Sequence, residues 1–218
     1  MNKTELVRFF DHTNLNQDAT DSDINKLCME AIEHNFYSVC VNPSYVTFAS
    51  ELLQNQKPIV CSVVGFPLGS NKSDIKLQEA LLAVTDGADE IDMVVNIADI
   101  KNGNYEKITD EVSTIRKNLP FNIILKVIVE SQNLSDTEIK KIAGILIDCD
   151  VQYIKTSTGF FGGATIENVE LIKSIVGEKI KIKASGGIKT YSDCIKLIKA
   201  GADRIGSSAS INIIDSID

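Results

Sequence analysis

The feature that most constrains the fold is a regular alternation along the whole chain. Eight short apolar runs, each bounded by turn residues, cover 7–12, 36–41, 58–66, 90–95, 122–130, 152–157, 180–185 and 203–207. Stretches with helical spacing of apolar residues separate these strand-like runs. The alternation predicts an α/β fold in which residues 1–218 form a single closed parallel (β/α)8 TIM barrel. An open doubly wound sheet is the alternative, and it is disfavoured because no G-x-G-x-x-G motif follows the first run.

Local signals support the helices between these runs. Ser135 followed by Glu138 is a capping-box pattern, and Thr190 is a second expected N-cap. A weak internal repeat, D-G-A-D-E-I-D at 86–92 and A-G-A-D-R-I-G at 200–206, is typical of a helix end, a glycine cap and a strand.

Composition excludes several classes of protein. The chain has 22 basic and 30 acidic residues, a net charge of −8 and no basic run, so a nucleic-acid or anionic-membrane partner is not expected. No apolar run reaches the roughly 18–20 residues of a membrane span, and the first residues lack a signal-peptide pattern. The five cysteines include no C-x-x-C pair, which favours a reducing cytoplasm over disulfides or a zinc site. The two histidines are too few for a His-rich metal site, although carboxylates could hold a hard cation.

Polar residues lie in or at the ends of several predicted strands. Active sites of (β/α)8 barrels lie at the C-terminal ends of the strands, so these residues are candidates for function. The second and fourth apolar runs contribute Cys40 and Asp92, and Asp11 is expected to end the first strand. The full set is Asp11, Cys40, Asp92, Lys126, Glu130, Lys155 and Lys183.

Lys155 and Lys183 each follow apolar strand residues and precede small ones, which is an unusual position for a surface lysine. A neutral lysine can attack a carbonyl and form a Schiff base, which then serves as an electron sink for carbon–carbon bond chemistry. Because an unperturbed lysine has a pKa near 10.4, burial and a neighbouring cation are needed to favour the neutral form. We therefore expect Lys155 to be the nucleophile, Lys183 to be the neighbouring cation and Asp92 to shuttle protons.

Glycine-rich segments follow the last three predicted strands. They are T-G-F-F-G-G-A-T at 158–165, S-G-G-I at 185–188 and G-S-S at 206–208. Backbone amides in such turns form anion-binding concavities, and phosphate sites of this fold commonly lie after strands 7 and 8. The three loops predict a phosphorylated ligand.

These motifs, in this order, resemble the deoxyribose-phosphate aldolase family along nearly the whole chain. The matching segments are D-H-T-N-L, V-C-V-N-P, G-A-D-E-I-D-M-V-V, L-K-V-I-V-E, Y-I-K-T-S-T-G-F, K-A-S-G-G-I and R-I-G-S-S. The resemblance implies a class I aldolase without metal or cofactor. It implies reversible cleavage of 2-deoxy-D-ribose 5-phosphate to D-glyceraldehyde 3-phosphate and acetaldehyde, in deoxyribose phosphate catabolism.

Roles for individual residues follow from the same resemblance. Lys155, Lys183 and Asp92 match the catalytic positions of the family. The positions matched to substrate binding are Asp11, Cys40, Lys126, Gly159, Gly186, Gly187, Gly206 and Ser208. Cys40 is equally well read as a small core hydrophobe.

Two features depart from the expected pattern. The chain ends without the tyrosine that some family members use for proton transfer. Lys181 shares a strand face with Lys183 by period two, and a strand that starts later, or a bulge, would be needed to place it in solvent.

Three other functions remain open from the residues alone. They are another Schiff-base barrel such as a transaldolase-like or keto-acid aldolase, a phosphometabolite-binding barrel without catalysis, and a purely structural barrel. The residues also leave open whether the chain forms a homodimer.

Overall fold

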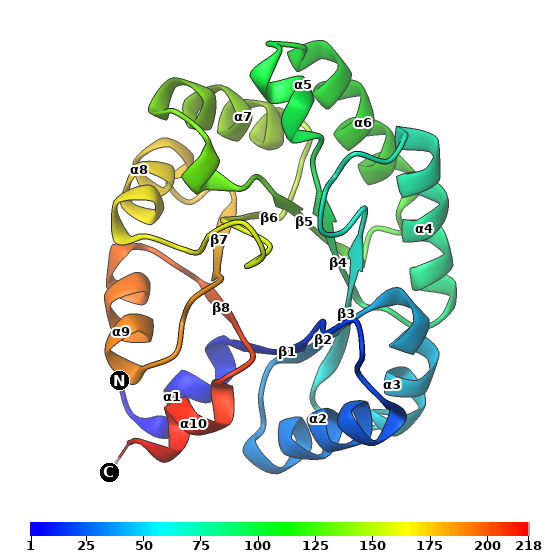
Figure 1. Cartoon of the computed structure of the whole chain (residues 1–218), viewed down its shortest axis with the longest axis vertical. Helices are drawn as coiled ribbons and strands as arrows, with labels where there is room; N and C mark the ends of the chain where they lie inside the picture. Colours follow the sequence, from blue (N-terminus) through cyan, green and yellow to red (C-terminus); the bar gives the residue numbers. More distant parts are fainter. Residues whose placement is uncertain (218) are drawn as a thin grey trace.

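The structure, a computed structural model, describes residues 1–217 and is a closed barrel of eight parallel strands in the order β1 to β8 (Figure 1). Each strand pairs in parallel with its neighbours in the chain, and β8 closes the barrel on β1. This confirms the predicted (β/α)8 fold. The strands are β1 (Phe10–Asn14), β2 (Ser38–Val41), β3 (Ile59–Val64), β4 (Glu90–Val94), β5 (Ile124–Ile128), β6 (Tyr153–Lys155), β7 (Lys181–Ser185) and β8 (Arg204–Ser207).

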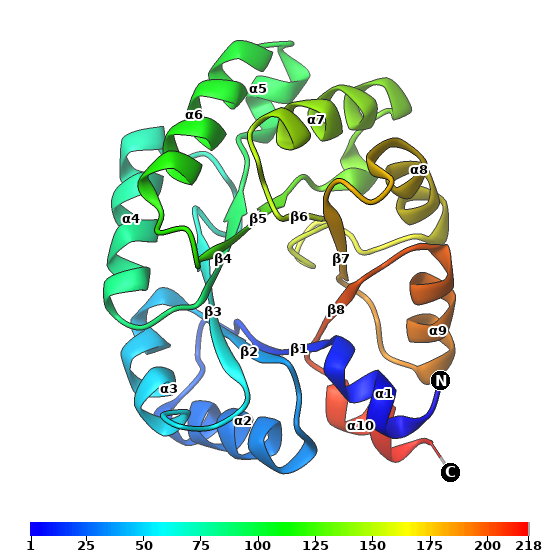
Figure 2. The ribbon, with the colours of Figure 1, turned by 180° about the vertical axis from the view of Figure 1, so that it is seen from behind.

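Helices surround the barrel as an outer ring, which Figure 2 shows from the opposite side. The α-helices are α1 (Lys3–Leu6), α2 (Asp21–His34), α3 (Val46–Leu52), α4 (Ser73–Thr85), α5 (Ile97–Lys101), α6 (Tyr105–Asn118), α7 (Asp136–Asp148), α8 (Ile166–Val176), α9 (Tyr191–Ala200) and α10 (Ser210–Asp215). Short 3-10 helices add η1 (Val7–Phe9), η2 (Pro43–Tyr45) and η3 (Ser131–Asn133). Among the described residues, no helix combines the length and the apolar character that a membrane span needs.

The predicted helix caps are confirmed. Ser135 and Glu138 form a capping box at the start of α7, and Thr190 forms one with Asp193 at the start of α9. The repeat also holds, because Gly87 and Gly201 follow α4 and α9 with φ values of 107° and 118°. A positive φ favours glycine, so both turns depend on that residue type.

The first predicted strand was wrong in its bounds. A capping box between Asn2 and Glu5 starts a helix, and 3-10 geometry continues to Phe9, so β1 covers Phe10–Asn14 instead of 7–12. Asp11 is therefore the second residue of β1 and lies deep in the barrel, not at the strand end.

The predicted strands that correspond to β5, β6 and β7 were also longer than the strands in the structure. Residues 156 and 157 lie beyond β6, and Glu130 lies beyond β5 with a left-handed φ of 51°. Strand β7 begins at Lys181, one residue later than predicted, and the Lys181 side chain is exposed at the N-terminal end of the barrel. Its Nζ lies 5.7 Å from the centroid of the Tyr153 ring, so solvent and an aromatic face accommodate this charge.

The two faces of the barrel sheet differ in polarity. Residues such as Val39, Ile91, Val127 and Ile205 are buried with the apolar faces of the helices in one hydrophobic core. The alternate positions point into the barrel and carry many charged side chains, which are nearly or completely buried except for Lys181 at the start of β7. All five cysteines are free and buried. The polar interior is the structural basis of the site.

Candidate active site

A cavity of about 700 Å³ opens beside the loops that follow β1, β6, β7 and β8. The loop after β6, drawn in yellow, bends inward over the barrel opening (Figure 1). Six predicted site residues line this cavity: Lys155, Gly159, Gly186, Gly187, Gly206 and Ser208. The location agrees with the C-terminal ends of the strands, where (β/α)8 barrels place their sites.

Lys155 ends β6 and is only 3% exposed, yet it contributes to the cavity wall. Its Nζ lies 2.7 Å from Oδ2 of Asp92 on β4. The Nζ of Lys183 on β7 lies 2.7 Å from the same oxygen. One carboxylate oxygen thus accepts hydrogen bonds from both lysines.

A second group of charges lies beside this trio inside the barrel. Lys126 Nζ is 2.9 Å from Asp92 Oδ1 and 2.5 Å from Glu90 Oε2. Asp11 bridges two cations, because its Oδ2 is 2.5 Å from Lys183 Nζ and its Oδ1 is 2.7 Å from Arg204 Nη1. The seven ionisable side chains form one continuous network across β1, β4, β5, β6, β7 and β8.

The network shifts the pKa values of its members. Burial alone would raise the pKa of Asp92, but Lys126, Lys155 and Lys183 outweigh burial and hold that pKa well below its usual range. Burial alone would lower the pKa of Lys183, yet Asp11 and Asp92 raise it above the ordinary lysine value. Asp92 is therefore an ionised acceptor and Lys183 a protonated donor at neutral pH.

The glycine loops form the opposite part of the cavity wall. Gly186 and Gly187 have φ values of 87° and 75°, which places two successive residues in a conformation that favours glycine. A Cβ at Gly186 would meet Gly162 O, Gly163 Cα and Ser157 Oγ, each at 2.8 Å. A Cβ at Gly187 would meet nothing within 4 Å, so its Cβ direction is open.

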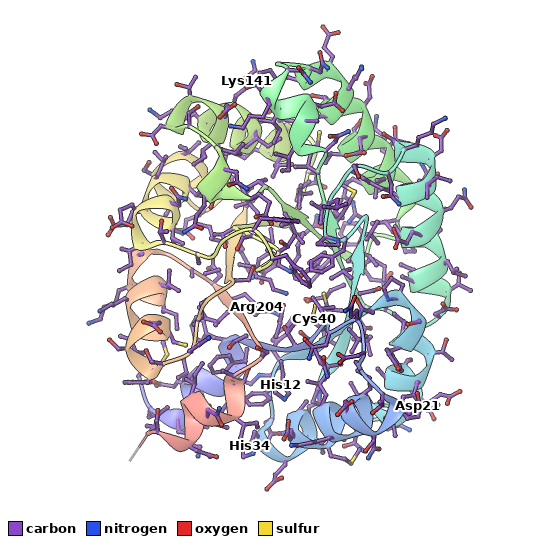
Figure 3. All side chains as sticks on the ribbon, viewed as in Figure 1. His12, Asp21, His34, Cys40, Lys141 and Arg204 are labelled. Atoms are coloured by element: carbon purple, nitrogen blue, oxygen red, sulfur yellow. The ribbon has the colours of Figure 1, made fainter. Side chains whose placement is uncertain are left out.

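Three residues predicted to bind substrate do not line this cavity. Asp11 and Lys126 are completely buried, do not line the cavity and contact other members of the ion network. Cys40 packs in a small apolar cluster with Cys61 and Val63 and does not line the cavity either. In Figure 3 Cys40 and Arg204 lie within the ring of strands, whereas His12 lies between β1 and α2. His12 bonds Glu30 of α2 through Nε2 at 2.8 Å.

Sequence reasoning missed Glu90 and Arg204. Both could have been found by period two, because Glu90 precedes Asp92 by two residues and Arg204 precedes Gly206 by two. Glu130, noted in the sequence without a role, is also buried. Its Oε1 accepts a hydrogen bond from the backbone N–H of Thr158, which ties the loop after β5 to the loop after β6.

The donor atoms of Cys40, Cys61 and Asp92 lie within 4.8 Å of one another. Two thiols and a carboxylate could in principle hold a soft cation. However, the Asp92 oxygens already accept from the Nζ atoms of three lysines, which would compete with any metal ion. We assign no metal site here.

The fold and the buried lysine–aspartate cluster beneath a cavity define the class of a (β/α)8-barrel enzyme. A family model described as DeoC/LacD family aldolase matches residues 6–214. The deoxyribose-phosphate aldolase of Carboxydothermus hydrogenoformans is 44% identical, and the alignment covers 100% of this chain and 97% of that protein. The enzyme of the same name from Mycoplasmoides pirum is 49% identical, with 94% of each chain covered.

A solved structure agrees with these relatives. The deoxyribose phosphate aldolase of Aeropyrum pernix, described as tetrameric, matches with a TM-score of 0.92 and 30% identity, over 98% of this chain and 91% of that one. The chain therefore belongs to the DeoC/LacD family of aldolases. The family resemblance seen in the sequence is confirmed.

Proposed function

We propose that this aldolase reversibly cleaves 2-deoxy-D-ribose 5-phosphate to D-glyceraldehyde 3-phosphate and acetaldehyde through a Schiff base on Lys155. The observation that carries the proposal is the position of Lys155. Of the four cations in the buried network, only Lys155 lines the cavity, so it is the amine that a bound carbonyl can reach. The names of the relatives supply the substrate, and this chain's own residues supply the chemistry.

In the cleavage direction, the neutral amine of Lys155 adds to C1 of the open-chain sugar, and loss of water gives an iminium ion. Removal of the proton from the C3 hydroxyl then breaks the C2–C3 bond and releases D-glyceraldehyde 3-phosphate. The electron pair of that bond remains as an enamine on Lys155. Protonation at C2 and hydrolysis of the imine release acetaldehyde and restore the amine.

Asp92 is placed to move protons during these steps. Its Oδ2 lies between Lys155 Nζ and Lys183 Nζ, at 2.7 Å from each. Because the pKa of Asp92 is well below its usual range, the carboxylate cannot store a proton for long. Lys183 is the natural reservoir from which Asp92 passes a proton towards the carbinolamine or enamine.

The phosphate is assigned to the glycine side of the cavity. Gly186, Gly187 and Ser208 line that side, and Gly159 comes from the neighbouring loop. Successive amides in left-handed turns form a concavity for an anion, which suits a sugar phosphate better than an unphosphorylated sugar. This arrangement favours the proposed substrate over the keto-acid alternative.

The direct test is reduction with borohydride in the presence of acetaldehyde, followed by peptide mass mapping and a cleavage assay with 2-deoxy-D-ribose 5-phosphate. We expect an ethyl adduct on Lys155 in the wild type and none on that peptide in Lys155→Met. Lys181→Met is the matched control, because Lys181 is an exposed lysine elsewhere in the same barrel. An adduct on a different lysine, or cleavage that survives in Lys155→Met, would contradict the assignment.

A further inference from the structure

The buried network contains one more cation than carboxylate. Its carboxylates are Asp11, Glu90 and Asp92. Its cations are Lys126, Lys155, Lys183 and Arg204. All seven residues are 3% exposed or less, so solvent screens their mutual interactions weakly. An unbalanced charge in such a place is costly unless one member of the network gives up its charge.

The contacts indicate which member that is. Lys126 meets Glu90 and Asp92, and Lys183 meets Asp11 and Asp92. Arg204 meets Asp11 at 2.7 Å and Glu90 at 3.6 Å, and a guanidinium keeps its proton in proteins. Lys155 meets one carboxylate among the described residues, and it shares that carboxylate with two other lysines.

We propose that Glu90 and Arg204 are positioning residues that set this charge balance, so that Lys155 is the network member left without a proton. Neither residue lines the cavity, so both act through Lys126, Asp11 and Asp92. Arg204 is held in place by Nη2, which donates to the Tyr153 hydroxyl at 3.1 Å, and by the Tyr37 ring, whose centroid is 3.4 Å from Cζ. This inference rests on the proposed function, because it explains how Lys155 becomes a nucleophile.

The charge environment of Lys155 includes groups from every strand. The titratable or charged groups of the barrel interior are Asp11, Cys40, Cys61, Glu90, Asp92, Lys126, Tyr153, Lys183 and Arg204. Glu130 is buried just beyond β5 and accepts from the Thr158 backbone in the loop after β6. The cavity is also lined by His12, Asp23, Lys26, Glu30 and Lys189. Lys26 and His12 both pair with Glu30, so these three groups have partners among themselves.

The proposal predicts shifts of opposite sign for the two residues. Glu90→Gln removes a negative charge and disfavours the ammonium form of Lys155, so adduct formation should persist to lower pH. Arg204→Gln removes a positive charge and leaves three cations for three carboxylates. The acid limb of the pH profile, meaning the pH range in which adduct formation on Lys155 falls off, should therefore move to higher pH. Each shift should be roughly one pH unit, as expected for a unit charge removed from a weakly screened site.

The measurement is the pH at which borohydride trapping with acetaldehyde falls to half, with circular dichroism to confirm folding of each variant. The double variant Glu90→Gln/Arg204→Gln restores the excess of one cation and should return towards the wild-type pH. Arg204→Lys keeps the charge and should not move the limb. Lys181→Gln removes an exposed charge from the same strand as Lys183 and is the control for long-range effects.

The outcomes separate the two proposals. If the wild type gives no adduct on Lys155, the proposed function fails first. A second outcome is that the wild type gives the adduct while Glu90→Gln and Arg204→Gln both keep the wild-type acid limb, or both shift it in the same direction. In that case Glu90 and Arg204 are merely structural. Should Arg204→Gln not fold, Glu90→Gln and Arg204→Lys still decide, because the first must move the limb and the second must not.

Discussion

Substitution of Gly187 by alanine tests the phosphate side of the cavity with little other disturbance. The φ of Gly187 is 75°, a left-handed conformation that costs a non-glycine residue about 1–2 kcal/mol. A Cβ here would meet no atom within 4 Å, so no steric term adds to that cost. For a domain of this size each kcal/mol lowers the Tm by roughly 2–4 °C, and we expect a loss of roughly 2–8 °C.

The effect on binding should be larger than the effect on stability. Hydrogen bonds to a charged group contribute about 1.5–3 kcal/mol, so disturbing the amides around the phosphate should raise the KM roughly 10- to 150-fold. The assay compares KM for 2-deoxy-D-ribose 5-phosphate with that for unphosphorylated 2-deoxy-D-ribose. The second KM should stay unchanged, because the unphosphorylated sugar has no anion at Gly187.

Gly186→Ala is the matched comparison. Its Cβ would meet two backbone atoms and the Ser157 Oγ at 2.8 Å, so the loss of stability should exceed that of Gly187→Ala. Equal rises in both KM values for Gly187→Ala would refute a phosphate at this loop. If Gly187→Ala lowered the Tm as much as Gly186→Ala does, the conclusion that the Cβ direction of Gly187 is open would be refuted.

Three further substitutions have defined outcomes. Asp92→Asn should slow exchange of the acetaldehyde methyl hydrogens with solvent more than it slows adduct formation, and unchanged exchange would count against its proton-transfer role. Lys183→Leu should shift the acid limb of adduct trapping to higher pH, because the network then has equal numbers of cations and carboxylates; a limb that stays in place would contradict this. Lys76 is completely buried with its Nζ 3.0 Å from Glu111, so Lys76→Met should cost about 3–5 kcal/mol and lower the Tm by roughly 6–20 °C. Adding Glu111→Leu should recover most of that loss in a thermal melt, and no recovery would show that the pair is not the cause.

The sequence alone predicted the eight strands, Lys155 and the glycine-rich loops of the cavity wall. Apolar periodicity and capping signals are local, so they predicted eight strands, the starts of α7 and α9, and the glycine turns of the repeat. Lys155 and Lys183 were found because a lysine between apolar and small residues is unusual within a strand. The bounds of β1 were missed because the capping box at Asn2 competes with the apolar run that follows it.

Only the closed barrel decided how the charged residues combine. Asp11 and Arg204 are 193 residues apart, and they meet because β8 pairs with β1. Strand pairing also turns Asp11 and Lys126 towards other charges and Cys40 into an apolar cluster, away from the cavity. A carboxylate's partners depend on which strands close the ring, and that depends on long-range packing. The sequence therefore predicted Lys155 as the proposed nucleophile, and the tertiary structure brought together the charged side chains around it.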